Sequence, residues 1–165
     1  MASMLKKLFM RKKEEVIMAP ITGKVLPLEN VPDEVFSQKL VGDGLAIEPV
    51  EGTVVSPLDG EVIQVFPTKH AIGIRGDNGL EVLIHIGLDT VELNGEGFAA
   101  HVEQNSKVQA GDPLISFELE KIKSMSYSPI SPIIITNGEV VESMTKTDQE
   151  FVEKGKSVLI KVNKK

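Results

Sequence analysis

The sequence contains no cysteine, which excludes several kinds of chemistry at once. Disulfides, a thiolate nucleophile and cysteine-based metal sites are ruled out, and the composition favours a reducing compartment such as the cytoplasm. Tryptophan is also absent, and aromatic residues make up 4% of the chain, so Ile, Val and Leu must build the core. The chain also lacks a Gly-x-Ser-x-Gly elbow and a Walker loop. Hydrolysis by a serine or cysteine nucleophile and direct use of a nucleotide therefore have no support.

Positive charge is concentrated at the start of the chain and negative charge in its body. The first 13 residues hold five basic residues and no acid, so the net charge of −6 leaves −11 for residues 14–165. Such an acidic domain is a poor nucleic-acid binder. Residues 1–13 are too short and too charged to span a bilayer, but their apolar residues recur at helical spacing. This pattern predicts either a helix lying on anionic lipid or a disordered, solubilising tail.

The remainder of the chain is typical of one all-β domain. We divide the sequence into a tail, residues 1–15, and a single domain, residues 16–165, whose length suits one core. Short alternating or β-branched runs separated by Gly, Pro, Asn and Asp predict an antiparallel β-sandwich or barrel. The clearest strands are at residues 24–26, 45–47, 61–65, 71–74 and 81–84. A few short helical turns are expected at residues 33–37, 119–124 and 147–152.

Two internal repeats indicate duplicated hairpin modules. The pattern Pro-x-x-Gly-x-Val occurs at residues 20–25 and 57–62, and Val-x-x-Gly-x-x-Leu/Val occurs at residues 108–114 and 152–158. Similar modules occur in lipoyl and biotinyl carriers and in lysostaphin-like zinc peptidases. A carrier of that kind needs a modifiable lysine at a hairpin tip, and such a peptidase needs a His-x-His pair. The candidate turn in this chain is Asp-Asn, which contains no lysine, and the sequence has no His-x-His. Both features count against these two classes of protein.

Two of the three histidines flank one predicted turn. His70 and His85 lie on either side of the loop GDNG at residues 76–79, and facing residues of an antiparallel hairpin have numbers with a constant sum. The sum of 70 and 85 equals that of 77 and 78. We therefore predict that the two imidazoles are directly opposed on one face, with Cβ atoms about 4.5–5.5 Å apart. Rings so placed could share a proton, a metal ion or a transferred group.

The composition of this pair favours group transfer over metal binding. Zinc sites need three or four protein ligands, but the predicted hairpin aligns two histidines. The third histidine, His101, lies in a polar stretch typical of a surface loop and is not expected to complete a ligand set. We therefore expect no metal and no cofactor. A neutral imidazole is a nucleophile toward phosphoryl groups, and repulsion between adjacent rings disfavours protonating both. The pair therefore predicts phosphoryl transfer, with one neutral ring as nucleophile and the other stabilising phosphoryl oxygens.

Longer motifs around both histidines resemble one protein family. The run GLEVLIHIGLDTVELNGEGF at residues 79–98 resembles the phosphorylation-site signature of glucose-type enzyme IIA proteins of the bacterial sugar phosphotransferase system. The segment TKHA at residues 68–71 resembles the second-histidine segment of that family, and residues 30–36 and 41–44 resemble its N-terminal part. The resemblance extends from about residue 16 to the C-terminus. It implies a β-sandwich phosphocarrier. Because the chain ends within the region of resemblance, we expect it to act without fused IIB or IIC domains.

The resemblance also implies roles for individual residues. His85 would accept phosphoryl on Nε2 from the phospho-histidine protein HPr and donate it to a cysteine of a IIB domain. His70 would be its partner. Thr68 would hydrogen-bond the ring of His70, and the carbonyl of Gly87 would orient the nucleophilic ring. Contacts of this kind decide which ring nitrogen is free.

The resemblance implies that five further residues surround the pair. Asp33 and Asp89 would edge the site. Phe36, Val41 and Val91 would form an apolar rim for docking of HPr and the IIB domain. Partial burial in the core is the alternative interpretation for this rim, and for Val91 in particular.

The alternatives to a phosphocarrier belong to other functional classes. A non-catalytic regulatory binding protein of the same fold is one, and a lysostaphin-like zinc peptidase is the other. We expect a cytoplasmic protein, with peripheral attachment to the membrane if residues 1–13 bind lipid. The sugar is not encoded in this chain, because the resemblance implies that specificity belongs to the membrane partner.

Overall fold

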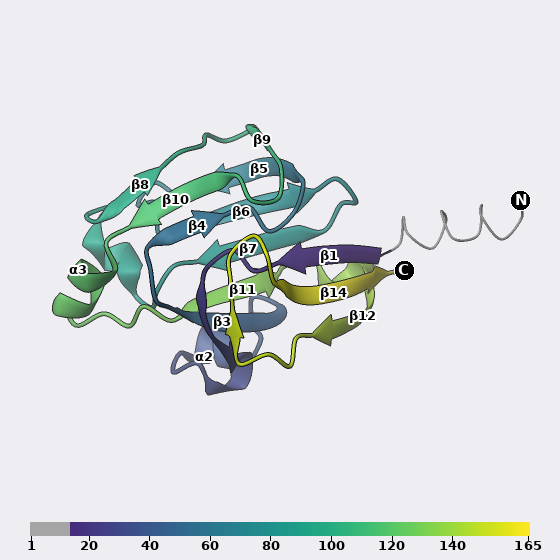
Figure 1. The fold of residues 1–165 in the computed structure, drawn as a ribbon, viewed down its shortest axis with the longest axis horizontal. Helices are drawn as coiled ribbons and strands as arrows, with labels where there is room; N and C mark the ends of the chain where they lie inside the picture. The colour runs from purple at the N-terminus through teal and green to yellow at the C-terminus, as the bar shows by residue number, and fades with distance from the viewer. Residues whose placement is uncertain (1–13) are drawn as a thin grey trace, which may run out of the picture.

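The strands predicted from alternating and β-branched runs all form. The computed structural model describes residues 14–165, so the predicted lipid-binding helix or tail at residues 1–13 lies outside the described part (Figure 1). The first strand begins at Glu14, and Glu15 is buried with 7% of its surface exposed. Residues 14 and 15, which the sequence division assigned to the tail, are therefore part of a sheet.

Short strands dominate the described residues, with brief helical turns between them. The strands are β1 (Glu14–Met18), β2 (Gly23–Pro27), β3 (Asp43–Pro49), β4 (Thr53–Val55), β5 (Gly60–Val65), β6 (Ala71–Gly76), β7 (Glu81–His85), β8 (Phe98–Ala100), β9 (Lys107–Val108), β10 (Pro113–Phe117), β11 (Ser131–Ile135), β12 (Val141–Lys146), β13 (Phe151–Val152) and β14 (Val158–Lys164). The turns are η1 (Leu28–Asn30), α2 (Glu34–Ser37), η2 (Thr90–Leu93), α3 (Leu119–Ser124) and η3 (Gly138–Val140). Within residues 14–165, no helix has the length and apolar character needed to cross a bilayer.

Two of the three predicted helical turns are confirmed by α2 and α3, and the third is wrong. At residues 147–152, the Thr147 hydroxyl accepts the N–H of Gln149 at 3.2 Å, which closes a local turn. Phe151 and Val152 then form β13 on the edge of a sheet, paired with β2. An available strand edge supplies backbone hydrogen bonds more readily than a single helical turn, because the first turn of a helix is costly to nucleate.

The strands form one large sheet and two small ones, and every pairing among the described strands is antiparallel. The eight-stranded sheet has the order β13-β2-β3-β11-β7-β6-β5-β9. The three-stranded sheets are β4-β10-β8 and β1-β14-β12, which Figure 1 shows packed beside the large sheet. This arrangement confirms the predicted antiparallel β-sandwich.

The sequence repeats occupy equivalent places in the two halves of the large sheet. Gly23 opens β2 and Gly60 opens β5, and a Cβ at either position would lie 2.1 Å from a carbonyl oxygen of the neighbouring strand. Val152 lies in β13 and Val108 in β9, which are the two edge strands. The order β13-β2-β3-β11 is thus mirrored by β9-β5-β6-β7, and the predicted duplication of hairpin modules is confirmed.

The β6–β7 hairpin differs from its predicted register by one residue. Ala71, and not His70, pairs with His85. The turn contains three residues instead of two, since the N–H of Gly79 donates to the carbonyl of Gly76 at 2.8 Å and Gly79 has a φ of +88°. A glycine in this conformation adds a bulge to the hairpin and shifts the pairing by one.

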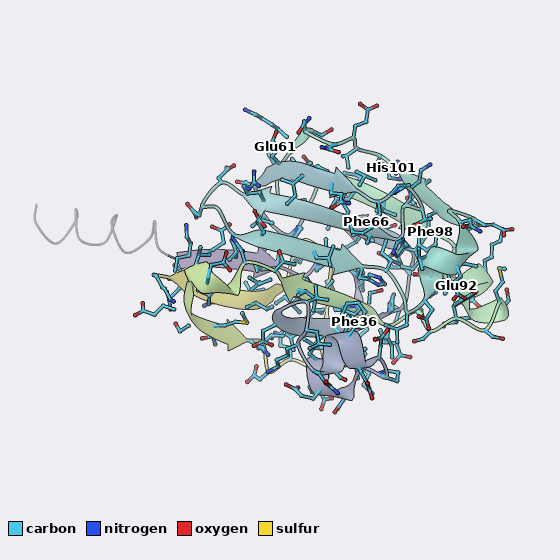
Figure 2. The ribbon with its side chains drawn as sticks, turned by 180° about the vertical axis from the view of Figure 1, so that it is seen from behind. Phe36, Glu61, Phe66, Glu92, Phe98 and His101 are labelled. Atoms are coloured by element: carbon cyan, nitrogen blue, oxygen red, sulfur yellow. The ribbon has the colours of Figure 1, made fainter. Side chains whose placement is uncertain are left out.

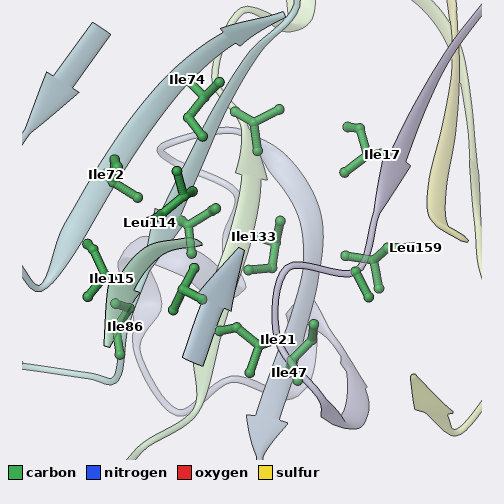
Figure 3. Close-up of a cluster of buried hydrophobic side chains, with 14 of the residues drawn as sticks. Ile17, Ile21, Ile47, Ile72, Ile74, Ile86, Leu114, Ile115, Ile133 and Leu159 are labelled. Carbon is green, nitrogen blue, oxygen red and sulfur yellow. The ribbon is translucent and has the colours of Figure 1, made fainter. Parts of the chain in front are cut away.

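Aliphatic side chains fill the space between the sheets, as the composition requires. Figure 3 shows these side chains converging from several strands. The largest fully buried ones are Ile17, Ile21, Leu28, Ile47, Ile72, Ile74, Leu80, Ile84, Ile86, Leu114, Ile115 and Ile122. A smaller cluster contains Phe36, Ala46, Leu88 and Ile134. Because side chains alternate along a strand, this cluster lies on the other face of the large sheet, where it supports α2.

Candidate functional site

The two predicted histidines are in contact at one end of the β6–β7 hairpin. The ring centroids of His70 and His85 are 4.9 Å apart, and the ring planes are inclined at 83°. His85 is the last residue of β7, and His70 lies in the turn that leads into β6. The prediction that the imidazoles lie side by side is therefore confirmed, although the direct pairing expected to bring them together does not occur.

A backbone carbonyl fixes the tautomer of His85. Its Nδ1 lies 2.8 Å from the carbonyl oxygen of Gly87, which can only accept a hydrogen bond. Nδ1 therefore carries the proton, and Nε2 has a free lone pair. The turn requires glycine, because Gly87 has a φ of +75° and a Cβ there would lie 2.5 Å from a methyl group of Thr90.

A distant segment holds this turn in place. The N–H of Gly87 donates to the hydroxyl of the fully buried Ser131 at 3.2 Å, and the N–H of Leu88 donates to the carbonyl of Ser128 at 3.0 Å. The second of these bonds belongs to the peptide whose carbonyl receives Nδ1 of His85. Neither serine was predicted, because both lie about 40 residues away along the chain and only the β7–β11 pairing brings them near.

His70 is more enclosed than His85, with 5% of its surface exposed. The hydroxyl of Thr68 shares a hydrogen bond with its Nδ1, which leaves Nε2 for another partner. The ring of Phe66 packs edge-on against His70 with centroids 5.5 Å apart, and Figure 2 labels this side chain. Phe66 was not predicted, and its signal was an aromatic residue two positions before the TKHA segment in a chain with few aromatics.

Burial keeps both rings neutral at pH 7. It lowers the pKa of His70 to about 4, and the neighbouring His85 contributes to the same shift. Burial also lowers the pKa of His85, but the carbonyl of Gly87 and the carboxylates of Asp33 and Asp89 oppose that change. Both rings are therefore neutral, and the surroundings of His85 partly stabilise a positive charge on its ring.

The low pKa of His70 predicts a specific pH dependence of stability. Between about pH 6.5, the usual histidine value, and about pH 4, the unfolded chain binds a proton that the folded protein does not. The free energy of unfolding should therefore fall as pH falls through this range, by about 2–3 kcal/mol from this residue. The change His70→Gln should remove that part of the decline, measured by urea unfolding at pH 7 and pH 4. The same decline in both proteins would contradict the assignment.

Asp33 and Asp89 both lie at the edge of the pair. Asp33 precedes α2 and caps it, since its Oδ1 accepts the N–H of Val35 at 3.0 Å. Asp89 directly precedes η2 and has a φ of +59°. Each carboxylate raises the pKa of His85, so each is near enough to stabilise a positive charge there.

The three predicted rim residues differ in their exposure. Phe36 is 5% exposed, and its ring centroid lies 5.0 Å from that of His85, so it forms a wall of the site. Val41 is partly buried and packs on the smaller core cluster that contains Phe36. Val91 is 48% exposed, so the alternative that it is buried in the core is wrong. The open part of the predicted rim is thus Val91.

The third histidine pairs with a different residue. Nε2 of His101 lies 2.6 Å from the hydroxyl of Ser116, and the His101 side chain is exposed, as predicted (Figure 2). Across residues 14–165, no group of three or more His, Asp or Glu residues is arranged to hold a metal ion.

Comparisons with known proteins match this site to one family. The family described as "phosphoenolpyruvate-dependent sugar phosphotransferase system, EIIA 1" matches residues 15–141. A relative from Bacillus cereus named "PTS system glucose-specific EIIA component" is 52% identical over 165 residues, covering 98% of this chain and 100% of the relative. One of the same name from Staphylococcus aureus is 52% identical, covering 96% and 98%. The solved structure of glucose permease IIA from Mycoplasma capricolum is 38% identical, with a TM-score of 0.80 over 90% of this chain and 96% of that one.

Proposed function

This chain belongs to the EIIA 1 family of the phosphoenolpyruvate-dependent sugar phosphotransferase system, and on that premise we propose that His85 is the residue that carries the phosphoryl group. Membership makes the protein a phosphotransferase component with a phosphocarrier role in sugar uptake. The observation that supports His85 is its hydrogen bond to Gly87, which leaves the lone pair of Nε2 free beside a second imidazole.

The proposed reaction consists of two displacements at phosphorus. In the first, the Nε2 lone pair of His85 attacks the phosphorus of phospho-HPr, and the P–N bond to HPr breaks with its electron pair returning to the HPr imidazole. In the second, a cysteine thiolate of the IIB domain attacks the same phosphorus, and the electron pair of the P–N bond returns to His85. The proton on Nδ1 stays in place through both steps, held by the carbonyl of Gly87.

The acidic edge of the site stabilises the phosphorylated form. Attack by a neutral ring that keeps its Nδ1 proton leaves a positive charge on the imidazole of His85. The groups that raise the pKa of His85, namely Gly87, Asp33 and Asp89, stabilise that charge. They do so without protonating Nε2 beforehand, because burial lowers the pKa of the same ring.

His70 is assigned the role of a neutral hydrogen-bond donor. With its pKa near 4, it holds one proton at pH 7. If the Thr68 hydroxyl donates to Nδ1, that proton resides on Nε2 and can donate to a phosphoryl oxygen on His85. A donor fixed before the reaction stabilises the charge that develops in the transition state.

The surface beside the pair is suited to docking HPr and the IIB domain. Three large apolar side chains are exposed on the elements that flank the pair. They are Val91 in η2, Val35 in α2 and Leu40 shortly after α2, and Leu40 is 69% exposed. Phe36, the residue after Val35 in α2, packs against the ring of His85. An exposed apolar rim around a reactive group marks a protein interaction site.

We expect Val91→Asn to weaken docking without affecting chemistry. The KM for phospho-HPr should rise about 10-fold while kcat stays unchanged, because the side chain contributes equally to ground-state and transition-state binding. Steady-state phosphoryl transfer would measure both values. Val16→Asn is the matched control, since Val16 is 37% exposed and lies beside Asn78 at the turn end of the hairpin, away from the histidines. Equal effects of the two substitutions would contradict a docking role for Val91.

The intact mass after incubation with phospho-HPr tests the proposed function. One phosphoryl group should be added, labile in acid and stable in base, and addition of a IIB domain should remove it. A protein that gains no phosphoryl group would point to the regulatory alternative. We place the transfer in the cytoplasm, and attachment to the inner membrane face through residues 1–13 remains a prediction that vesicle binding with and without those residues would test.

A further inference from the structure

The position of His70 does not follow from the register of the hairpin. Ala71 pairs with His85, so these two side chains project from the same face of the sheet. Regular alternation would place the side chain of residue 70 on the opposite face, the side on which Ile72 enters the core. The ring of His70 nevertheless packs against that of His85, with centroids 4.9 Å apart.

The backbone departs from regular strand geometry at Lys69. This residue has a φ of +59°, and its N–H donates to the carbonyl of Phe66 at 2.7 Å. The N–H of Phe66 donates to the carbonyl of Ala71 at 3.1 Å, which closes a loop over residues 67–70 in the connection between β5 and β6. A left-handed φ is uncommon for a residue with a side chain, and such outliers persist where surrounding structure imposes them.

The side chain of Lys69 gives no reason for this conformation. It is exposed, and within residues 14–165 its ammonium forms no ion pair. Its backbone, by contrast, lies between Thr68 and His70, the two members of the hydrogen bond that fixes the partner ring. The turn therefore sets both where His70 lies and what its Nδ1 contacts.

We propose that Lys69 is a positioning residue whose left-handed backbone, and not its charge, directs the His70 ring onto His85. The effect on phosphoryl transfer rests on the proposed function. The effect on the location of the ring does not, and it can be measured without any phosphoryl donor.

The test compares substitutions that remove the same charge but differ in the backbone they accept. Glycine and asparagine adopt a left-handed φ readily, whereas valine resists it. In Lys69→Val, the His70 ring should leave its enclosed position, and its pKa, followed by NMR titration of the ring protons, should rise from about 4 toward 6.5. Onward transfer to the IIB domain should slow by about 10-fold or more, up to the roughly 10²–10³-fold expected for losing one transition-state donor. Lys69→Gly and Lys69→Asn should retain the low pKa and the transfer rate.

A second left-handed position controls for strain alone. Asn105 has a φ of +74°, is exposed, and lies in the connection between β8 and β9. Asn105→Val should lose stability as Lys69→Val does, but it should leave the titration of His70 and onward transfer unchanged.

Three results would overturn the inference. They are an unshifted His70 titration in Lys69→Val, a loss of transfer in Lys69→Gly as large as in Lys69→Val, and a shifted His70 titration in Asn105→Val. If Lys69→Val does not fold, Lys69→Gly and Lys69→Asn decide the question, since a displaced His70 in either contradicts the role of φ. If the wild-type protein accepts no phosphoryl group, the proposed function fails, while the titrations still decide whether Lys69 positions His70.

Discussion

Replacing His85 by alanine should leave a folded protein that accepts no phosphoryl group from phospho-HPr. His85 is the only member of the pair whose Nδ1 is held by a carbonyl that must accept, so its Nε2 is the nitrogen with an assured lone pair. Removing a nucleophile removes the covalent step itself, and no rate remains for neighbouring groups to support. Intact mass after exposure to phospho-HPr should show complete loss of the phosphorylated species.

His101→Ala is the matched control for this substitution. His101 is the remaining histidine outside the pair, and its ring contacts Ser116 instead of His70 or His85. This variant should gain one phosphoryl group as the wild-type protein does. A phosphorylated His85→Ala protein would show that another nucleophile carries the group, and His70 would then be the first to test.

The location of the candidate site could be predicted from the sequence, because two residues can be placed at the same end of a hairpin without knowing the exact register of its strands. Placing His70 and His85 near each other requires the turn between them, and the Gly, Asp and Asn residues there identified it. The register required one more fact, namely that Gly79 takes a left-handed conformation and adds a residue to the turn. The face on which His70 lies required another, the conformation of Lys69. These two departures from regular geometry together preserved the contact that a simpler hairpin was expected to make.

Residues that support the site from a distance could not be predicted. Ser131 and Ser128 hold the Gly87 turn across a pairing between strands separated by more than 40 residues. Nothing in the sequence around these two serines distinguishes them from serines that have no role at the site. The repeats behave differently, because the glycine in each motif marks a place where the backbone of the neighbouring strand comes close, as Gly23 and Gly60 show.

The exposure of the rim residues also depends on long-range packing that the local sequence does not show. Phe36 was expected on a docking rim, with partial burial as the alternative, and the contacts of α2 with the large sheet bury it against His85. Val91 was considered a candidate for burial, but η2 leaves it in solvent. An apolar residue near a site can form its wall or its docking surface, and only the packing of the element that carries it distinguishes the two.

Replacing His70 by alanine should leave phosphoryl acceptance measurable and slow onward transfer to the IIB domain by about 10²–10³-fold, the usual effect of losing one transition-state donor. The proposed nucleophile, His85, keeps its tautomer in this variant, because the bond from its Nδ1 to the carbonyl of Gly87 does not involve His70. The neutral donor, however, is lost. Single-turnover transfer from the phosphorylated protein to a IIB domain would measure the slow step directly.

Thr68→Val provides the second half of this experiment. If the Thr68 hydroxyl acts only by keeping the proton on Nε2 of His70, its loss should slow the same step by less than His70→Ala. Adding Thr68→Val to His70→Ala should then have no further effect, because residues that act through one group are non-additive. Independent, additive losses would mean that Thr68 contacts the phosphoryl group by itself. An unchanged rate in His70→Ala would leave the second imidazole with a purely structural role, and the charge on the phosphoryl oxygens would have to be stabilised by the docked partner.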